Sequence, residues 1–300
     1  MPGPIIELMG GNNWKGAAAA LALFSVNAWI TAWLFHAPYT VQMASIEGAF
    51  IGLARYIGAH FGDLGWFPLW YGGIPFPNSY PPLLHVVVAA VAVIGRISAG
   101  LAYHAVVAAA YALGPVALYW AARRLGAGRA AAFAGCLLYS LLSPSCWLVS
   151  EVRAGAGGWF GPRRLMTLVQ NGEGPHIASL LFLALAMGAL HLALARRGPL
   201  DTVASAMALA CVALSNWIGA FALAIAVVCY LLAGWDGAWI PRWLRAAAIG
   251  CYAYALALPW VTPSTIRTLP SFVVGPRSAV DNCVRPTSCA QFKTSLCCVR

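Results

Sequence analysis

The sequence contains few charged residues and very few acids. Only 9% of its 300 residues are charged, and 8 Asp and Glu stand against 18 Lys and Arg. Hydrophobic residues make up 61% of the chain and the mean hydropathy is +0.76. Ordinary water-soluble domains do not combine these values. The scarcity of charge therefore predicts an integral membrane protein.

A further absence narrows the class of membrane protein. The alternation of apolar and polar residues that a membrane β-barrel requires is missing. Instead, segments rich in Ala, Leu, Val and Gly are separated by Arg clusters or turn residues, which predicts an all-α protein whose helices span a hydrocarbon core of about 30 Å. Most Arg lie in short runs between these segments. This distribution indicates membrane orientation and argues against nucleic-acid binding.

The apolar segments give a first count of the spans. Eight segments qualify, at residues 17–35, 82–97, 101–121, 130–149, 176–194, 202–214, 219–233 and 246–260. Three basic clusters lie between the later segments, at residues 123–129, 196–197 and 242–245. If all eight segments crossed the membrane with Lys15 inside, these clusters would all face outward, against the positive-inside rule.

Treating segment 82–97 as a helix that does not cross the membrane removes the conflict. It would be only about 24 Å long, it begins beside two prolines, and it carries Arg96 near its end. We therefore predict an interfacial or re-entrant helix here and seven transmembrane helices in all. Residues 1–16 and the three basic clusters are then cytoplasmic, while residues 36–100 and 150–175 form two outer loops.

The first outer loop contains a second predicted surface helix. Five apolar residues recur there at helical spacing: Met43, Ile46, Phe50, Leu53 and Ile57. Arg55 falls opposite this stripe and Glu47 lies about a quarter turn from its centre. An amphipathic helix of this kind lies along the membrane surface. The predicted fold is thus seven transmembrane helices with two interfacial helices in the first outer loop.

An aromatic and proline-rich stretch joins the two surface helices and carries a resemblance to a known family. It resembles the first-loop motif of the GT-C superfamily of membrane glycosyltransferases, closest to bacterial members labelled 6-pyruvoyl-tetrahydropterin synthase-related membrane proteins. The matching residues are Gly65, Pro68, Trp70, Gly72, Gly73, Pro75, Tyr80, Pro81, Pro82 and Leu83. Downstream, "RRLGAGRAAAFAG" is similar to the family's turn between the second and third spans, and "NGEGPHIASLLFLALAMG" to the acidic motif that opens its fourth span.

The resemblance covers roughly residues 17–260 and implies a function. Such a protein would lie in the inner membrane of a bacterium, contact the bilayer lipids, and move a sugar from a polyprenyl-phosphate carrier to an acceptor on the outer face. Two departures favour an altered mechanism or lost catalysis. "FHAPYTVQ" lacks the Asp that many members place directly after the first span, and Asn216 stands in "ALSNWIGAFAL", where relatives often have Ser-His.

Inverting sugar transfer needs a carboxylate to deprotonate the acceptor and positive charge or a metal to stabilise the departing phosphate. Glu47 and Glu173 are the predicted catalytic residues, because the family carries its acids in these two regions. The alternative for Glu47 is a solvated flank of the surface helix. The alternative for Glu173 is a favourable interaction with a helix dipole. Asp63 and Glu151 also fit ordinary loop charges.

Further residues are predicted to bind the substrate. Arg163 and Arg164, beside Arg153, suit a lipid phosphate because guanidinium groups bind its oxygens in pairs, although Arg at an interface also contacts lipid headgroups. Five residues are predicted to line the cavity: Trp70, Tyr80, His85, His176 and Asn216. Aromatic residues also gather at membrane interfaces for amphipathic reasons. No zinc-site spacing is present, and the use of a divalent cation, Mg²⁺ or Mn²⁺, stays open.

The last part of the chain has a different composition. Residues 261–300 are predicted to begin outside and to end in a polar tail that carries Cys283, Cys289, Cys297 and Cys298 without metal-site spacing. Since GT-C relatives commonly continue with more spans, we expect an architecture that has been cut short. Two rival functions remain: a lipid-binding or scaffold protein without catalysis, and a transporter, although the repeated halves of many carriers are not detected.

Overall fold

The computed structural model describes residues 13–70, 72–234 and 239–263. Within these ranges the chain is almost entirely helical, with one two-stranded ribbon as its sheet, which confirms the predicted all-α class. Contacts divide the chain into two units, Met1–Trp260 and Val261–Arg300, and the first unit is described below. The four cysteines predicted to form the tail lie outside the described residues.

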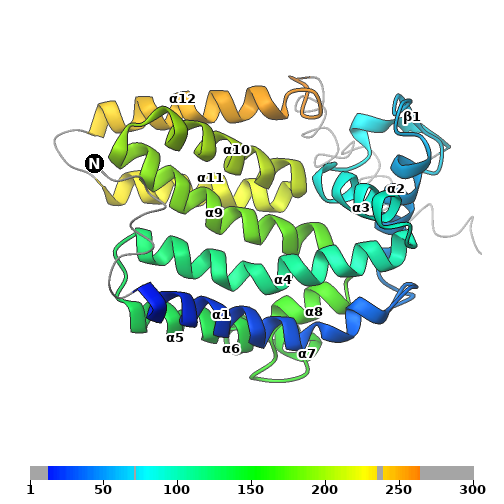
Figure 1. Ribbon diagram of the computed structural model, residues 1–300, viewed down its shortest axis with the longest axis horizontal. Coiled ribbons are helices and arrows are strands. Elements are labelled where there is room, and N and C mark those ends of the chain that lie inside the picture. The colour runs from blue at the N-terminus through cyan, green and yellow to red at the C-terminus, as the bar shows by residue number, and fades with distance from the viewer. Residues whose placement is uncertain (1–12, 71, 235–238, 264–300) are drawn as a thin grey trace, which may run out of the picture. The chain divides into compact units, whose positions relative to one another are not determined.

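Six long helices form the body of the first unit: α1 (Asn13–Ile30), α4 (Ala99–Arg124), α9 (Gly174–Arg196), α10 (Pro199–Ser215), α11 (Trp217–Ala233) and α12 (Trp239–Ala257). Figure 1 shows α4 and α9 in the middle, with α1 on one side and α10, α11 and α12 on the other. Small residues let these helices approach closely. At Gly188 of α9, for example, a Cβ atom would overlap the Trp120 ring of α4.

Among the residues that the structure describes, two helices are long and apolar enough to cross a membrane. These are α4, with 26 residues, and α9, with 23. Four apolar helices are shorter: α3 (Leu83–Gly95), α5 (Arg129–Leu141), α10 and α11. A membrane-crossing helix needs about 20 residues. Length and composition therefore support membrane association through α4 and α9, and they do not by themselves give seven spans.

The predicted helix at residues 130–149 was wrong in its length. Helix α5 ends at Leu141, and a separate turn, α6 (Ser145–Leu148), follows. Pro144 explains the break, because the residue before a proline is disfavoured in helical conformation and the proline ring excludes the preceding turn. The segment predicted at 17–35 is similarly divided, into α1 and a short 3-10 helix, η1 (Ala32–His36).

The first predicted outer loop is a folded structure at one end of the long helices (Figure 1). It contains α2 (Glu47–Ala59), strands β1 (Trp66–Phe67) and β2 (Ile74–Pro75), a 3-10 turn η2 (Phe76–Asn78), and α3. Helices α2 and α3 pack on each other and on α4. Both predicted surface helices are therefore present as helices, and they are anchored on the body of the protein.

Part of the predicted apolar stripe was wrong. Phe50, Leu53 and Ile57 are buried as expected, but Met43 and Ile46 precede α2 and are exposed. Glu47 begins the helix and is buried. The sequence pattern could not show this, because the groups that cover Glu47 come from distant parts of the chain.

The aromatic stretch between α2 and α3 forms a small core of its own. The rings of Phe67 and Phe76 are almost fully buried and pack edge to face, with centroids 5.8 Å apart. Tyr56 of α2 packs on both rings. Gly73, at φ +113°, turns the chain where a Cβ atom would overlap the Trp66 indole. Aromatic packing therefore holds this stretch in a defined conformation.

The second predicted outer loop also contains short helices. They are α7 (Ser150–Gly155) and α8 (Arg163–Val169), and α8 packs against α9. The loop thus approaches the beginning of α9 as a structured segment, and it meets α2 and α4 there.

Candidate functional site

The first predicted acid, Glu47, is buried in a contact with a histidine from a distant helix. One carboxylate oxygen contacts Nε2 of His104, in α4, and the other accepts a hydrogen bond from the Val41 N–H at 3.1 Å. Nδ1 of His104 lies 2.6 Å from the Ala37 carbonyl oxygen. Only 3% of Glu47 is exposed. Both oxygens of this carboxylate are therefore occupied by the protein.

The partners of His104 determine its protonation. A carbonyl oxygen only accepts hydrogen bonds, so Nδ1 must carry a hydrogen toward Ala37. The contact between Nε2 and Glu47 then needs one further proton, on the imidazole or on the carboxyl group. Either position makes the pair neutral overall. A neutral pair explains how two ionisable side chains are accommodated in a buried place.

The segment before α9 closes over this pair. Gly172 has φ +71°, and a Cβ atom there would overlap Glu47. The Tyr103 hydroxyl donates to the Gly172 carbonyl at 2.9 Å and accepts from the Gly174 N–H at 3.1 Å. A residue with a side chain would thus be strained by its backbone and obstructed by its neighbour. Helices α2 and α4 and the second outer loop meet at Glu47.

The second predicted acid, Glu173, follows directly in this segment. It is half-buried, and burial raises the pKa of its carboxyl group above the usual 4.5. It occupies the position before α9, but its side chain accepts no capping hydrogen bond. Its charge acts on Tyr80 and on Tyr103, and Tyr103 also feels Glu47. The two predicted acids are therefore neighbours in space, and Glu173 is the more accessible.

Three of the predicted lining residues are assembled beside Glu173. The Asn216 amide donates to the Tyr80 hydroxyl oxygen at 2.9 Å and accepts from the Gly219 N–H at 3.1 Å, which caps α11. The Asn216 side chain also interacts with His176. Burial, followed by the Glu173 charge, raises the pKa of Tyr80, so its phenol stays protonated. We name Glu173, His176, Tyr80 and Asn216 the polar cluster.

The other two predicted lining residues, His85 and Trp70, pack against neighbouring aromatic rings. His85 is almost fully buried, and its ring packs against Phe50 at 5.3 Å and Tyr80 at 5.6 Å between centroids. Burial lowers the pKa of His85 to about 3. The Phe50 backbone acts in the opposite direction and raises this pKa, but neither ring nitrogen of His85 forms a hydrogen bond of normal geometry. Trp70 is half-buried, with its ring edge against Phe67. His85 is thus neutral and holds Tyr80 in place.

The predicted phosphate-binding arginines lie in different surroundings. Arg164 is buried between the rings of Tyr111 and Tyr139, 4.1 and 4.5 Å from their centroids, and donates to the Tyr111 carbonyl oxygen at 2.8 Å. It links α8 to α4 and α5 inside the protein. Arg163 is half-buried, and its charge acts on His176. Of these two, Arg163 is the one whose charge acts on a residue of the polar cluster.

The third predicted arginine belongs to the second outer loop itself. The Arg153 guanidinium carbon lies 3.8 Å from the centroid of the Trp159 ring, a cation–π distance. Trp147 donates from its indole nitrogen to the Trp159 carbonyl oxygen at 2.7 Å. Arg153 therefore stabilises the loop conformation, and no contact of the described residues connects it to the polar cluster.

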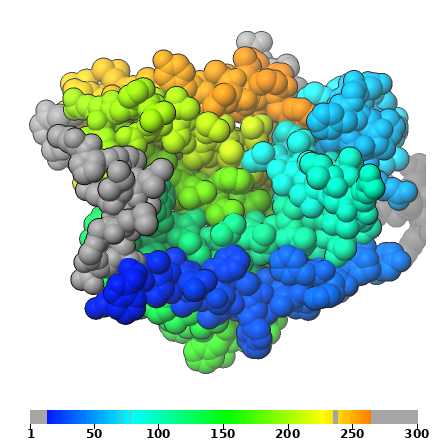
Figure 2. All heavy atoms as spheres, viewed as in Figure 1, coloured from blue at the N-terminus to red at the C-terminus, as the bar shows by residue number. Residues whose placement is uncertain are grey.

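An apolar groove of about 300 Å³ adjoins the polar cluster. It lies among α3, α4, α9 and α10 and is lined by Leu83, Leu84, Val87, Val106, Ala109, Ala110, Leu113, Ala178, Leu181, Phe182 and Ser215. Ser215 precedes Asn216, and Leu83 follows the Tyr80 motif, so the groove begins where the cluster ends. Figure 2 shows the space-filling face on which the green atoms of α9 lie between those of α4 and α10. The arrangement suits a ligand with an apolar chain and a polar head.

No metal centre is evident among residues 13–70, 72–234 and 239–263. No group of three or more His, Cys, Asp or Glu side chains lies close enough together to hold an ion. Glu47 and Glu173 approach each other, but they supply only two carboxylates. Whether the protein uses Mg²⁺ or Mn²⁺ therefore stays a question for experiment.

His104 is the site residue that the sequence analysis missed. It stands in "LAYHAVV", within a predicted transmembrane segment. An ionisable residue in such a segment is expected to face a polar partner inside the protein. That rule alone would have marked His104, whereas its pairing with Glu47, 57 residues away, depends on the tertiary fold.

Comparison with known proteins adds no relative to this description. No protein-family model matches the chain, and neither does any curated protein or solved structure. The candidate site is therefore defined by its own geometry: two acids, a tyrosine–asparagine–histidine group, one arginine and an adjoining apolar groove.

Proposed function

We propose that this chain is a polytopic membrane glycosyltransferase that takes a sugar from a polyprenyl-phosphate carrier and transfers it to an acceptor on the extracytoplasmic face of the membrane. The single observation that carries the proposal is the Tyr80–Asn216 hydrogen bond at the end of an apolar groove, where the charge of Glu173 acts on Tyr80 and that of Arg163 on His176. The groove suits the isoprenoid chain, and the polar groups suit the sugar phosphate. The first-loop resemblance to GT-C enzymes points to the same substrate class.

The proposed membrane arrangement has seven spans: α1, α4, α5 with α6, α9, α10, α11 and α12. Large apolar side chains on these helices are exposed, including Leu138, Ile218, Phe221, Leu244 and Tyr252. Exposed apolar surface of this extent needs cover, which bilayer lipid supplies. The shorter helices α5, α10 and α11 would cross with local thinning of the bilayer.

The orientation follows from the positive-inside rule. The basic clusters at residues 123–129, 196–197 and 242–245 would face the cytoplasm. Helix α9, at about 1.5 Å per residue, is about 34 Å long, close to the thickness of a bilayer core. Glu173 precedes its first residue and Arg197 follows its last. The polar cluster would then lie at the outer face.

Glu173 is the proposed general base. In an inverting transfer the acceptor oxygen bonds to the anomeric carbon while its proton passes to the base and the polyprenyl phosphate leaves with the electrons of the broken bond. A carboxyl group whose pKa is raised toward neutrality by burial is a better base than an ordinary one. Arg163 is the proposed partner of the departing phosphate. Tyr80 and Asn216 are proposed to orient the sugar hydroxyls.

Glu47 has a different proposed part. Its two oxygens are occupied by His104 and the Val41 N–H, so it is poorly placed to take a proton from an acceptor. We assign it a positioning role: the Glu47–His104 pair holds the second outer loop against α2 and thereby sets the location of Glu173.

The test measures transfer from labelled polyprenyl-phosphate sugars in membranes with and without the protein. A panel of hexose and pentose donors is needed, because the structure does not specify the sugar. Glu173→Gln should lower transfer by about 10²–10⁴-fold. Glu151→Gln is the matched control, since that acid is exposed in the second outer loop. Equal transfer by both variants would disprove the site assignment.

A lipid-binding protein without catalysis is the second candidate function. The occupied carboxylate of Glu47 and the buried guanidinium of Arg164 favour it, because both side chains then serve the fold. Retention of polyprenyl phosphate by the purified protein, with no transfer from any donor, would support this function over the enzymatic one.

A further inference from the structure

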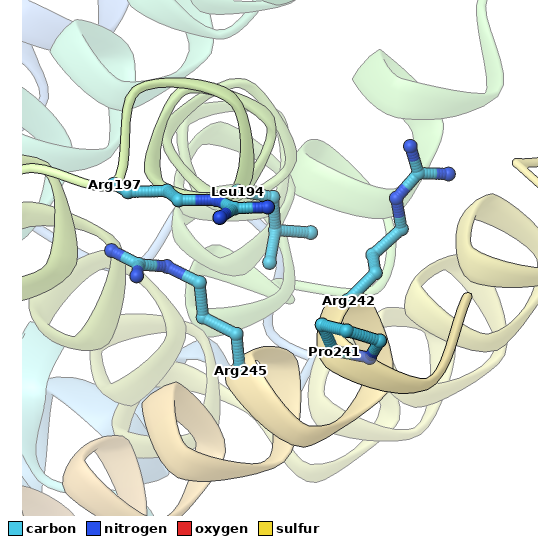
Figure 3. A pocket seen from close by; sticks show the side chains of 5 residues that line it. All are labelled: Leu194, Arg197, Pro241, Arg242 and Arg245. Atoms are coloured by element: carbon cyan, nitrogen blue, oxygen red, sulfur yellow. The ribbon is translucent and has the colours of Figure 1, made fainter. Parts of the chain in front are cut away.

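A second basic site lies at the other end of α9. Its pocket has a volume of about 220 Å³ and is lined by Leu194, Arg197, Pro241, Arg242 and Arg245. Figure 3 shows Arg197 reaching across from the end of α9, and Arg242 and Arg245 extending from the first turns of α12, around the Leu194 side chain. All three side chains line one concave place, and their guanidinium groups point in different directions.

The three arginines are held to different degrees. Arg245 is fixed, because its Nε donates to the Ala193 carbonyl oxygen at 3.0 Å and its Nη2 to the Thr202 hydroxyl at 3.2 Å. Arg242 contacts the Gly234 carbonyl oxygen, and its charge acts on His191. The guanidinium group of Arg197 has no hydrogen bond or ion pair with any residue that the structure describes. Arg245 is therefore held in place by the protein, and the guanidinium group of Arg197 is available to a ligand.

Two of the three arginines, Arg197 and Arg245, have no acidic partner in the described part of the chain. In residues 13–70, 72–234 and 239–263, no carboxylate lies within ion-pair distance of Arg197 or Arg245. The nearest acid along α10 is Asp201, whose carboxylate lies against Gly198. Asp236 precedes α12 in the sequence but lies outside the described residues. Like charges gathered in this way repel one another unless an anion binds between them.

We propose that this pocket binds a phosphate group, carried either by an anionic lipid headgroup or by a soluble compound. Guanidinium groups bind phosphate oxygens through paired hydrogen bonds, and only part of the donor capacity of Arg245 is used inside the protein. The pocket lies about 34 Å along α9 from the polar cluster. Phosphate binding here does not depend on glycosyl transfer, so either proposal can fail alone.

The experiment uses the full chain purified in an uncharged detergent. In the lipid arm, the protein is exchanged into nanodiscs of phosphatidylcholine with or without phosphatidylglycerol, and bound lipid is measured by native mass spectrometry. In the soluble arm, thermal unfolding is followed during titration with pyrophosphate, with chloride of equal ionic strength as the control. The variants are Arg197→Gln and Arg245→Gln.

Arg129→Gln is the matched control, because it removes the same charge from another basic turn, outside the pocket. We expect Arg197→Gln to weaken phosphate binding at least about tenfold while Arg129→Gln leaves it unchanged. The Arg197 side chain is exposed and makes no hydrogen bond or ion pair with the described residues. Its variant should therefore fold normally even if the loss of Arg245 destabilises the protein. Circular dichroism checks this.

Each outcome has a defined meaning. Binding in the lipid arm assigns a lipid headgroup, and binding in the pyrophosphate arm assigns a soluble phosphate. Equal binding by Arg197→Gln, Arg129→Gln and the parent would overturn the proposal. So would the absence of binding from the parent in both arms.

Discussion

The two ends of α9 carry opposite chemistry. At its beginning, Glu173 belongs to the polar cluster, and burial raises the pKa of its carboxyl group. At its end, Arg197 lies in a pocket with Arg242 and Arg245. The helix between them is apolar. The difference follows the helix dipole, since carboxylates are favoured near a helix N-terminus and guanidinium groups near a C-terminus.

The comparison also separates two ways of placing a charge. Glu47 is buried and fully paired, and it fixes the loop that carries Glu173. Arg197 has no partner within the described part of the chain. A paired charge organises the fold, whereas an unpaired charge in a pocket is available to a ligand. Four substitutions test this contrast, from the largest expected effect to the smallest.

Glu173→Gln should lower sugar transfer by about 10²–10⁴-fold, because the proposed general base is lost. In the parent protein, the rate should rise with pH through a pKa above 4.5, since burial favours the protonated form and only the carboxylate can act as a base. Rates measured from pH 4 to 8 check this. A parent profile that is flat over this range would contradict the role.

The same shift predicts no loss of stability in Glu173→Gln. A carboxyl group whose pKa is raised in the folded state contributes stability below its unfolded pKa and loses that contribution as pH rises. At neutral pH the carboxylate is therefore unfavourable to the fold. The variant should unfold at the same temperature as the parent or higher, which distinguishes lost catalysis from lost structure.

His104→Ala should lower the free energy of unfolding by about 3–5 kcal/mol, because the buried Glu47 carboxyl group loses its histidine partner. Chemical denaturation in detergent measures the effect. His36→Ala, at an exposed position, is the control. The double variant Glu47→Gln with His104→Ala should recover part of the loss. A single variant as stable as the control would show that the pair does not organise this end.

Gly172→Ala should destabilise the protein by about 3 kcal/mol, because a positive φ strains alanine and its Cβ atom overlaps Glu47. Gly157→Ala is the matched control. It has φ +78° but open space around the added atom, so it should cost only about 1 kcal/mol. Equal effects of the two variants would mean that the segment before α9 does not pack on α2.

Arg197→Gln should weaken phosphate binding by about tenfold, equivalent to about 1.4 kcal/mol, and leave sugar transfer unchanged. Glu173→Gln should show the converse. Native mass spectrometry and the transfer assay, applied to both variants, test whether the two ends act independently. If Arg197→Gln also slowed transfer, the two sites would be coupled along α9.

Most helices could be predicted from the sequence, because apolar runs and turn residues are local signals. Segments 101–121 and 176–194 correspond to α4 and α9, with shifts of a few residues at their ends. The helix break at Pro144 could also have been predicted from the sequence, but the predicted helix at residues 130–149 ran through this proline. The sequence pattern could not predict that the long helices would bury so much of the first outer loop.

The candidate site was partly predictable. Glu173, Tyr80, His176 and Asn216 were chosen from a motif resemblance, and they are neighbours in the structure. The two adjacent arginines, Arg163 and Arg164, could not be told apart. They lie on different sides of α8, so one reaches the polar cluster and the other the Tyr111 ring.

The sequence by itself determined the helical class, the apolar surface and the asymmetric distribution of Arg, because these depend on composition and local order. Only the tertiary structure decided that Glu47 pairs with His104, and that Arg197 meets Arg242 and Arg245 in one pocket. Such partners come from segments tens of residues apart. Whether a charge is buried and paired or open to a ligand depends on which segments the fold brings together.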